Sequence, residues 1–159
     1  MASIDPGVDI GHVHLKVADL DRALGFYRDL LGFQVNATYP GAAFIAAGDY
    51  HHHIGLNTWE SAGGSPPPPG TTGLYHTAIR YPTRALLAEA LQRLIDAEYP
   101  LTGASDHGVS EALYLNDPDQ NGVELYWDRP RDRWPRKPDG GIDIFTAPLD
   151  LDDLLATAA

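Results

Sequence analysis

Two stretches of this chain, residues 9–60 and 74–128, carry the same order of strand and helix signals. At the start of the first stretch, apolar residues alternate with polar ones, which is the pattern of a half-buried strand. Asp19 can cap the helix that follows, and Gly32 is placed to end it. Three further strands complete a βαβββ order. The strands expected in this stretch are 10–17, 33–37, 42–47 and 51–57.

The second stretch repeats that order. A strand is expected at 74–81, followed by Thr83 as a helix cap and by Pro100 just beyond the helix end. Two of the later strands are clear from their apolar residues, at 111–115 and 122–127. The repeat predicts an α+β protein, in which two tandem modules form one domain over residues 1–159.

Two segments lie outside the repeat. Residues 61–73 are rich in proline and glycine, which is typical of an exposed linker between modules. Residues 129–159 form a C-terminal extension with a leucine-rich end that predicts a short amphipathic helix. This helix could pack on the body of the protein or on a second subunit, and the sequence does not decide between them.

The charge and the residue types exclude several classes of function. Lys and Arg total 11 against 22 for Asp and Glu, a formal net charge of −11, which disfavours nucleic-acid binding. No apolar run is long enough for a membrane span. The N-terminal residues show no secretory signal pattern, so a cytoplasmic location is expected. Because cysteine is absent, any metal must be held by imidazole and oxygen ligands.

The histidines point to a metal site. His12 and His76 hold the same place, early in the first strand of each module. Glu124 lies among apolar neighbours in the last strand, so alternation turns it towards the opposite face. A buried carboxylate needs a cation or a strong donor. Two imidazoles and one carboxylate leave open positions suited to Fe(II) with substrate and dioxygen, although Mn(II), Ni(II), Co(II) or Zn(II) could use the same ligands.

Residues 11–33 and 114–125 resemble the start and end of modules in the vicinal-oxygen-chelate (glyoxalase/bleomycin resistance/dioxygenase) superfamily. The resemblance covers residues 9–128. It implies paired βαβββ modules whose curved mixed sheets surround one metal cavity. Three motifs look most like the type I extradiol catechol 2,3-dioxygenases, which act in aromatic-compound catabolism: residues 53–59, 106–114 and 124–130.

The resemblance also implies roles for individual residues. His12, His76 and Glu124 match the metal ligands of these dioxygenases. His53 matches an acid–base histidine and Tyr114 a tyrosine ten residues before the glutamate. His107 is the candidate for a further histidine of the family, although its spacing departs from the family's. Gly55 stands where a second glutamate would create another metal site.

Two neighbouring histidines are less clearly assigned. His14 shares a face with His12 and is expected to line the pocket, although it could be an alternative ligand. His51, like His52, is expected at the surface or around the site. Many relatives have four modules where this chain has two, so either a dimer partner or the C-terminal extension could complete the pocket wall. A homodimer or a higher homo-oligomer is expected.

These observations favour an Fe(II)-dependent extradiol dioxygenase with an aromatic diol and dioxygen as substrates. Two alternatives stay open. One is a non-redox metal enzyme of the superfamily, such as a glyoxalase-like lyase or an isomerase. The other is a metal-free resistance protein that binds a small molecule.

Overall fold

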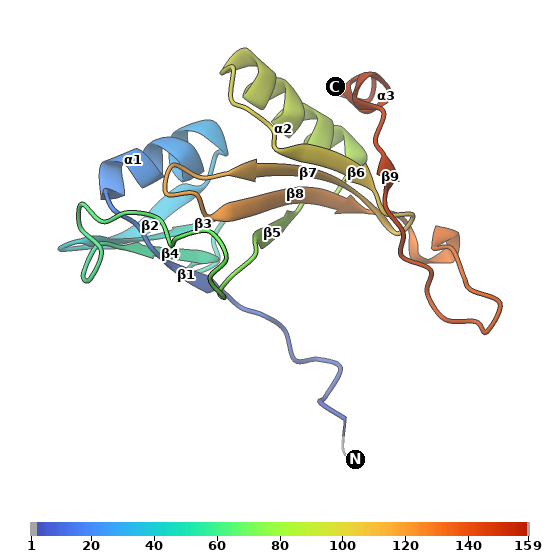
Figure 1. Ribbon diagram of the computed structural model, residues 1–159, viewed down its shortest axis with the longest axis horizontal. Helices are drawn as coiled ribbons and strands as arrows, with labels where there is room; N and C mark the ends of the chain where they lie inside the picture. Colours follow the sequence, from blue (N-terminus) through green and yellow to red (C-terminus); the bar gives the residue numbers. More distant parts are fainter. Residues whose placement is uncertain (1–2, 159) are drawn as a thin grey trace. The chain divides into compact units, whose positions relative to one another are not determined.

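The computed structural model describes residues 3–158, and the chain divides into two compact units. Unit 1 is Met1–Ser65 and unit 2 is Pro66–Ala159, so the division falls within the proline-rich stretch 61–73. Each unit is built on its own sheet (Figure 1). Among residues 3–158, none of the helices has the length and apolar character that crossing a membrane requires.

The described part of unit 1, residues 3–65, forms a four-stranded sheet with the strand order β1-β4-β3-β2. Strands β1 and β4 are parallel, and the other neighbours are antiparallel. The order of elements is the βαβββ order expected from the sequence. The elements are β1 (Val13–Lys16), α1 (Leu20–Leu24), η1 (Gly25–Leu30), β2 (Gln34–Tyr39), β3 (Ala42–Ala46) and β4 (Ile54–Asn57).

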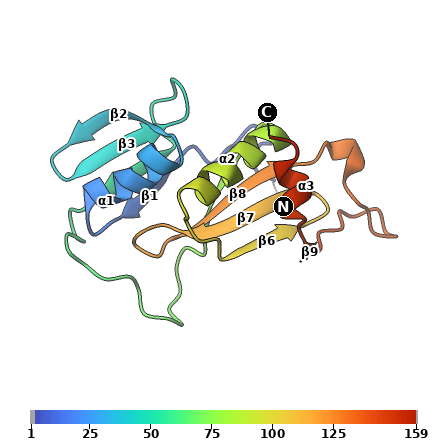
Figure 2. The ribbon, with the colours of Figure 1, turned by 90° about the horizontal axis from the view of Figure 1, so that it is seen from above.

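The helical segment of unit 1 begins and ends where the sequence predicts. The Asp19 carboxylate accepts a hydrogen bond from the backbone N–H of Arg22 at 2.8 Å, and Gly32 has the left-handed φ of 89° that a C-terminal stop requires. The segment is α-helical only to Leu24, and η1 has the wider π-helical turn. Figure 2 shows α1 lying across one face of this sheet, where Phe26 and Tyr27 are buried.

The described part of unit 2, residues 66–158, forms a five-stranded sheet with the order β5-β8-β7-β6-β9. Strand β6 was not located from the sequence because its residues, Gly-Ala-Ser-Asp, show no apolar alternation. The elements are β5 (Thr77–Arg80), α2 (Arg84–Asp96), β6 (Gly103–Asp106), β7 (Ser110–Asn116), β8 (Gly122–Asp128), η2 (Arg131–Arg133), β9 (Ala147–Pro148) and α3 (Leu151–Leu155).

The two faces of the unit 2 sheet have different roles. Helix α2 covers one face (Figures 1 and 2). Its leucines Leu87, Leu91 and Leu94 are buried, as are Leu113 of β7 and Leu125 of β8. The Thr83 hydroxyl accepts from the N–H of Leu86 at 3.2 Å and caps this helix, as predicted. Because side chains alternate along a strand, the polar residues between these leucines project from the opposite face.

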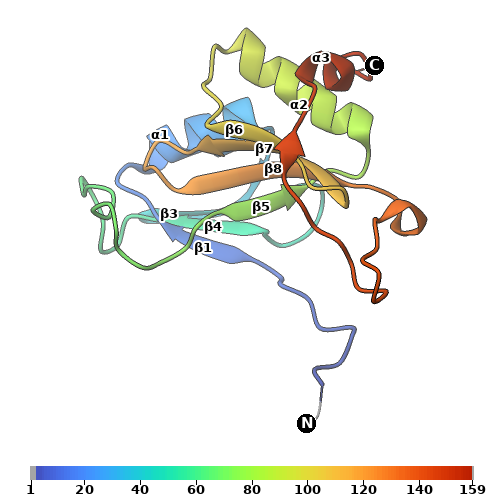
Figure 3. The ribbon, with the colours of Figure 1, turned by 45° about the vertical axis from the view of Figure 1, so that its right-hand side comes forward.

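The C-terminal extension packs on unit 2. Strand β9 pairs with the outer side of β6 (Figure 2), which adds a fifth strand that the sequence did not predict. Helix α3 lies against α2 (Figure 3), and Leu154 is fully buried. Arg84 of α2 binds the Asp153 carboxylate, with 2.7 Å between Nη2 and Oδ2. The extension is therefore part of the body of its own unit.

Replacing Leu154 by alanine is expected to lower the free energy of unfolding by about 2–4 kcal/mol, because the change leaves a cavity under α3. The matched change Leu155→Ala removes a half-buried side chain on the same helix and should lower it by less than about 1 kcal/mol. Urea denaturation followed by circular dichroism measures both. Equal effects of the two changes would contradict the packing of α3 on α2.

Candidate metal site and adjoining cavity

The candidate site lies on the face of the unit 2 sheet that α2 does not cover. The strand register places Ala78 of β5 opposite Glu124, and Glu124 opposite Tyr114 of β7. Side chains of directly paired residues project from the same face. His76 immediately precedes β5 and is two residues from Ala78, so alternation brings it to this face as well. Val123 and Leu125 project into the core, as expected from the alternation around Glu124.

His76 and Glu124 meet directly. The Nε2 atom of His76 is 2.9 Å from Oε2 of Glu124, and their side chains are 30% and 12% exposed. Both atoms are ligands for transition metals. Their separation is what two neighbouring ligands show when each lies about 2.1 Å from one shared cation. The donor types and their spacing therefore fit a divalent metal.

Tyr114 connects this pair to a second histidine. Its hydroxyl oxygen is 2.6 Å from Nε2 of His107 and 3.4 Å from Oε1 of Glu124. Burial, followed by the negative charge of Glu124, raises the pKa of Tyr114 to about 12. The hydroxyl therefore keeps its proton at neutral pH and is a hydrogen-bond donor there.

These side chains border an open cavity of about 660 Å³. His76, His107 and Tyr114 line it, together with Tyr75 and Thr146. Apolar and aromatic walls with a few convergent polar groups are typical of a small-molecule site. Thr146 belongs to the C-terminal extension, so this segment contributes to the cavity wall, which is one of the two possibilities that the sequence left open.

Gly122 sets the position of His76. A Cβ atom at residue 122 would overlap the carbonyl oxygen of Tyr75 and lie 3.1 Å from Cβ of His76. Only glycine allows the segment before β5 to approach β8 this closely. The sequence indicated residue 122 as the start of a strand and did not reveal this role of Gly122. The signal that could have found it is a glycine two positions before a ligand on the same strand.

In unit 1, the predicted site histidines lie in a cluster of rings. The ring of His12, which immediately precedes β1, is 4.4 Å from that of His52, and Nδ1 of His52 is 2.7 Å from Nδ1 of His51. Burial, followed by the neighbouring imidazoles, lowers the pKa of His52. Nδ1 of His53 accepts from the N–H of Ala47 at 3.3 Å.

Unit 1 has no carboxylate at the place that Glu124 holds in unit 2. His14 pairs with Gly55 in unit 1 just as Ala78 pairs with Glu124 in unit 2, so Gly55 is the equivalent position, as the sequence predicted. The ring of His14 lies over Gly55. A Cβ atom there would be 2.8 Å from Nδ1 of His14, so a longer side chain at this position would displace the imidazole.

The structure therefore brings together His76, Glu124, Tyr114 and His107 in unit 2, whereas His12 and His53 belong to unit 1. Within residues 3–158, no group of three or more histidine, aspartate or glutamate side chains is arranged to hold a metal. The complete ligand set of His12, His76 and Glu124 stays a prediction.

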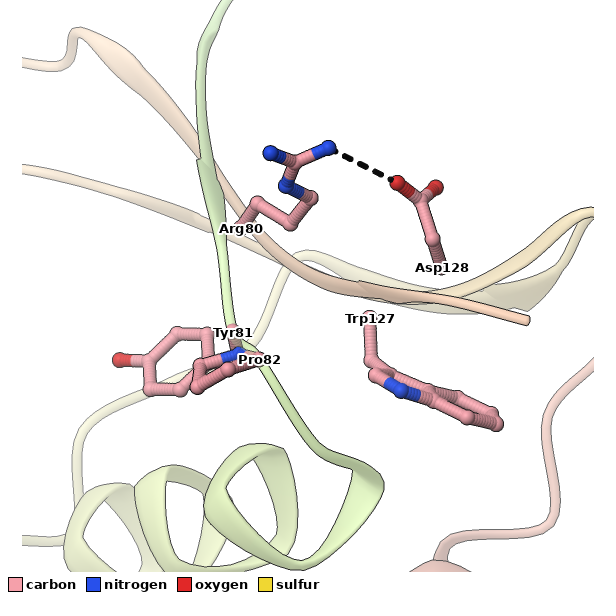
Figure 4. Close-up of a pocket in the computed structure, with 5 residues that line it drawn as sticks. All are labelled: Arg80, Tyr81, Pro82, Trp127 and Asp128. Carbon is pink, nitrogen blue, oxygen red and sulfur yellow. Dashed lines mark hydrogen bonds and ion pairs between the residues drawn. The ribbon is translucent and has the colours of Figure 1, made fainter. Parts of the chain in front are cut away.

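A second depression on unit 2, of about 430 Å³, has fewer groups suited to metal binding or catalysis (Figure 4). Arg80 and Asp128 form an exposed ion pair there, with 3.4 Å between Nη1 and Oδ2. Trp127 and the Tyr81-Pro82 pair lie on the other side of the strands, towards α2. Exposed ion pairs of this kind contribute little to stability or recognition.

Comparison with known proteins identifies the family. Residues 9–125 match the family model of the Glyoxalase/Bleomycin resistance protein/Dioxygenase superfamily. The chain belongs to this superfamily. The glyoxalase/dioxygenase of Nostoc punctiforme has the same fold, with a TM-score of 0.65 at 20% identity over 81% of this chain and 98% of that one. The lactoylglutathione lyase of Agrobacterium tumefaciens has a TM-score of 0.60 at 27% identity, over 77% and 96% of the two chains.

Two relatives within the superfamily are dioxygenases by name. The catechol-2,3-dioxygenase of Bacillus subtilis (strain 168) is 41% identical over 158 residues, which is 99% of this chain and 55% of that protein. Biphenyl-2,3-diol 1,2-dioxygenase 3 of Rhodococcus globerulus is 33% identical over 75% of this chain and 63% of its own length. The chain thus spans little more than half the length of these relatives.

Replacing Gly122 by alanine is expected to push His76 away from Glu124 and to weaken divalent-metal binding by about 10- to 100-fold, the usual effect of disturbing the support of a ligand. Titration with Co(II) or Zn(II), followed by absorbance or calorimetry, measures this. Gly25→Ala is the matched control, because a Cβ there meets nothing within 4 Å. Unchanged affinity in a folded Gly122→Ala protein would show that His76 is not a ligand.

Proposed function

We propose that this protein is an Fe(II)-dependent extradiol dioxygenase that opens the ring of a catechol-type aromatic diol. The observation that carries the proposal is the pairing of His76 with Glu124 beside the Tyr114–His107 hydrogen bond on one open cavity. An imidazole–carboxylate pair next to a hydroxyl and a second imidazole supplies both a metal site and proton-handling groups. The 41% identity to a catechol-2,3-dioxygenase supports this assignment.

His12, His76 and Glu124 would hold the metal. When bound, Fe(II) supplies a centre that binds the diol oxygens and dioxygen together and lowers the pKa of the diol. Three protein ligands suit this chemistry because they leave positions open for both substrates. Mn(II), Ni(II), Co(II) and Zn(II) are the other metals that this ligand set accepts.

The remaining polar residues would manage protons. Tyr114 hydrogen-bonds a substrate oxygen, because its hydroxyl faces the cavity beside Glu124. His107, which contacts Tyr114, would stabilise negative charge that develops on oxygen once the imidazole has taken up a proton during the reaction. His53 is proposed as the general base that takes a proton from the diol, a role suited to an imidazole.

A homodimer or higher homo-oligomer is proposed as the working assembly. The candidate cavity on unit 2 is open, and a second copy would supply a further wall for it. A cytoplasmic location is proposed with it.

A non-redox metal enzyme is the second candidate. The likeness to the Agrobacterium tumefaciens lactoylglutathione lyase, at 27% identity, favours it. Proton abstraction beside a carbonyl calls for a further carboxylate base, however, and the equivalent position in unit 1 is Gly55, covered by the ring of His14. A metal-free binding protein is the third candidate, and the His76–Glu124 pair argues against it.

Anaerobic loading with Fe(II), followed by oxygen uptake and absorbance with a panel of catechols, tests the proposal. We expect a yellow ring-opened product. Its rate should fall by at least about 100-fold in His76→Ala and Glu124→Ala, since each change removes a ligand. In Tyr114→Phe the loss of one hydrogen bond to a reacting oxygen should lower kcat by about 100-fold.

Tyr126→Phe is the matched control, because Tyr126 lies on the same sheet but does not line the cavity with His76. Bound metal without oxygen uptake for any catechol would move the assignment to the non-redox candidate. A protein that binds small molecules but no metal, with full binding in His76→Ala, would point to the third.

A further inference from the structure

Both ring nitrogens of His107 are engaged, and one of them contacts the C-terminal segment, residues 129–158. Nδ1 is 2.8 Å from the backbone carbonyl oxygen of Phe145, and Nε2 is 2.6 Å from the hydroxyl oxygen of Tyr114. The hydroxyl of Thr146 lies farther from Nδ1, at 3.4 Å. His107 therefore stands between the C-terminal segment and the site.

The carbonyl contact has a chemical consequence. A carbonyl oxygen can only accept a hydrogen bond, so Nδ1 of His107 must carry the proton. A neutral imidazole has one N–H, which leaves Nε2 as an acceptor. The hydroxyl of Tyr114 then donates its proton to Nε2, the shorter of its two contacts, rather than to Glu124 at 3.4 Å.

Several contacts hold the C-terminal segment in this place. Arg129 binds the carboxylate of Asp106 through both terminal nitrogens, at 2.5 and 2.9 Å. Strand β9 pairs Ala147 with Asp106, and the N–H of Phe145 returns a hydrogen bond to the carbonyl of His107 at 3.4 Å. The bonds at the N–H of Phe145 and at Ala147 hold the backbone on both sides of the Phe145 carbonyl, which points at the imidazole of His107.

Gly108 allows the close approach. Its φ is 74°, and a Cβ atom there would lie 2.5 Å from Cε1 of Phe145 and 2.8 Å from Cγ of Pro135. At the far end of the segment, the Arg84–Asp153 ion pair and the buried Leu154 attach α3 to α2. The segment is thus held at both ends and pressed against the residue that follows His107.

We propose that the C-terminal segment is a positioning element, which selects the Nδ1–H tautomer of His107 through the Phe145 carbonyl and so turns the acceptor lone pairs of Tyr114 towards a bound ligand. Glu124 then keeps Oε1 free of a hydroxyl donor and available for a cation. The tautomer stands on the geometry alone. Its consequence for a diol, that the substrate hydroxyl donates to Tyr114, rests on the proposed dioxygenase function.

Long-range ¹H–¹⁵N NMR of the metal-free full-length protein tests the tautomer without any activity. Spectra are recorded over a range of pH, and the tautomer is read where they no longer change as the pH is raised. His107→Gln identifies the resonances by their loss. We expect Nδ1 to be protonated and Nε2 bare in the unmodified protein. A protonated Nε2 would overturn the proposal.

Two substitutions at the contact between Gly108 and the C-terminal segment test whether this segment selects the tautomer. Phe145→Gly removes the ring that packs on Gly108 and loosens the backbone, whereas Gly108→Ala pushes the segment away. Both are expected to replace the single tautomer by a mixture. Lys137→Ala, an exposed change in the same segment, should leave it unchanged. A pure Nδ1–H tautomer in both folded variants would show that the segment does not select it.

A kinetic measurement distinguishes a failure of this proposal from a failure of the proposed dioxygenase function. If a catechol is turned over, Phe145→Gly should lower kcat by about tenfold with little change in KM, because the change misplaces a supporting group rather than a binding one. An unchanged kcat would overturn the role of the segment in turnover. If no catechol is turned over, the dioxygenase assignment fails while the tautomer result stands.

Discussion

The register of the β7–β8 hairpin determines what the cavity face of unit 2 contains. Asp117, which is buried in its turn, accepts hydrogen bonds from the N–H groups of Asp119 and Asn121 at 2.9 and 2.8 Å, and from the side-chain amide of Asn121 at 2.9 Å. A slip of one residue would turn Tyr114 and Glu124 into the core, since side chains alternate along a strand. The Asp117 turn and the buried apolar face of the hairpin together hold the register, and so the face on which the metal-binding and proton-handling groups lie.

A second carboxylate connects the core side of the same sheet to the C-terminal segment. Glu111 is 4% exposed and bound by Arg84 at 2.7 Å and by Arg129 at 2.7 Å. Losing either arginine would leave a buried charge poorly compensated, which is costly. Arg84 also holds Asp153 and Arg129 also holds Asp106, so this cluster anchors the segment at two points. The cavity face depends on the segment through His107, and the segment depends on charges at the edge of the core.

The two modules show how one backbone order is used for two purposes. Each pairs its first strand with its last in parallel, and each has a histidine immediately before the first strand. Unit 2 places a carboxylate opposite the small residue Ala78, whereas unit 1 places the ring of His14 over Gly55. The imidazole occupies the space that a carboxylate side chain would need. The repeat therefore preserves the scaffold and changes the chemistry at one register position.

By itself, the sequence determined the module order, the helix caps at Asp19 and Thr83, and the face of Glu124, because hydrophobic periodicity and capping are local. Strand β6 and strand β9 carry no such periodicity. They form because a neighbouring strand offers unpaired backbone groups: the next strand, β7, for β6, and β6, which is distant in the chain, for β9. The close approach at Gly122 and the contact of the Phe145 carbonyl with His107 were not predicted either. Both involve backbone atoms, which are the same in every residue, so only the tertiary structure could decide where they meet the site.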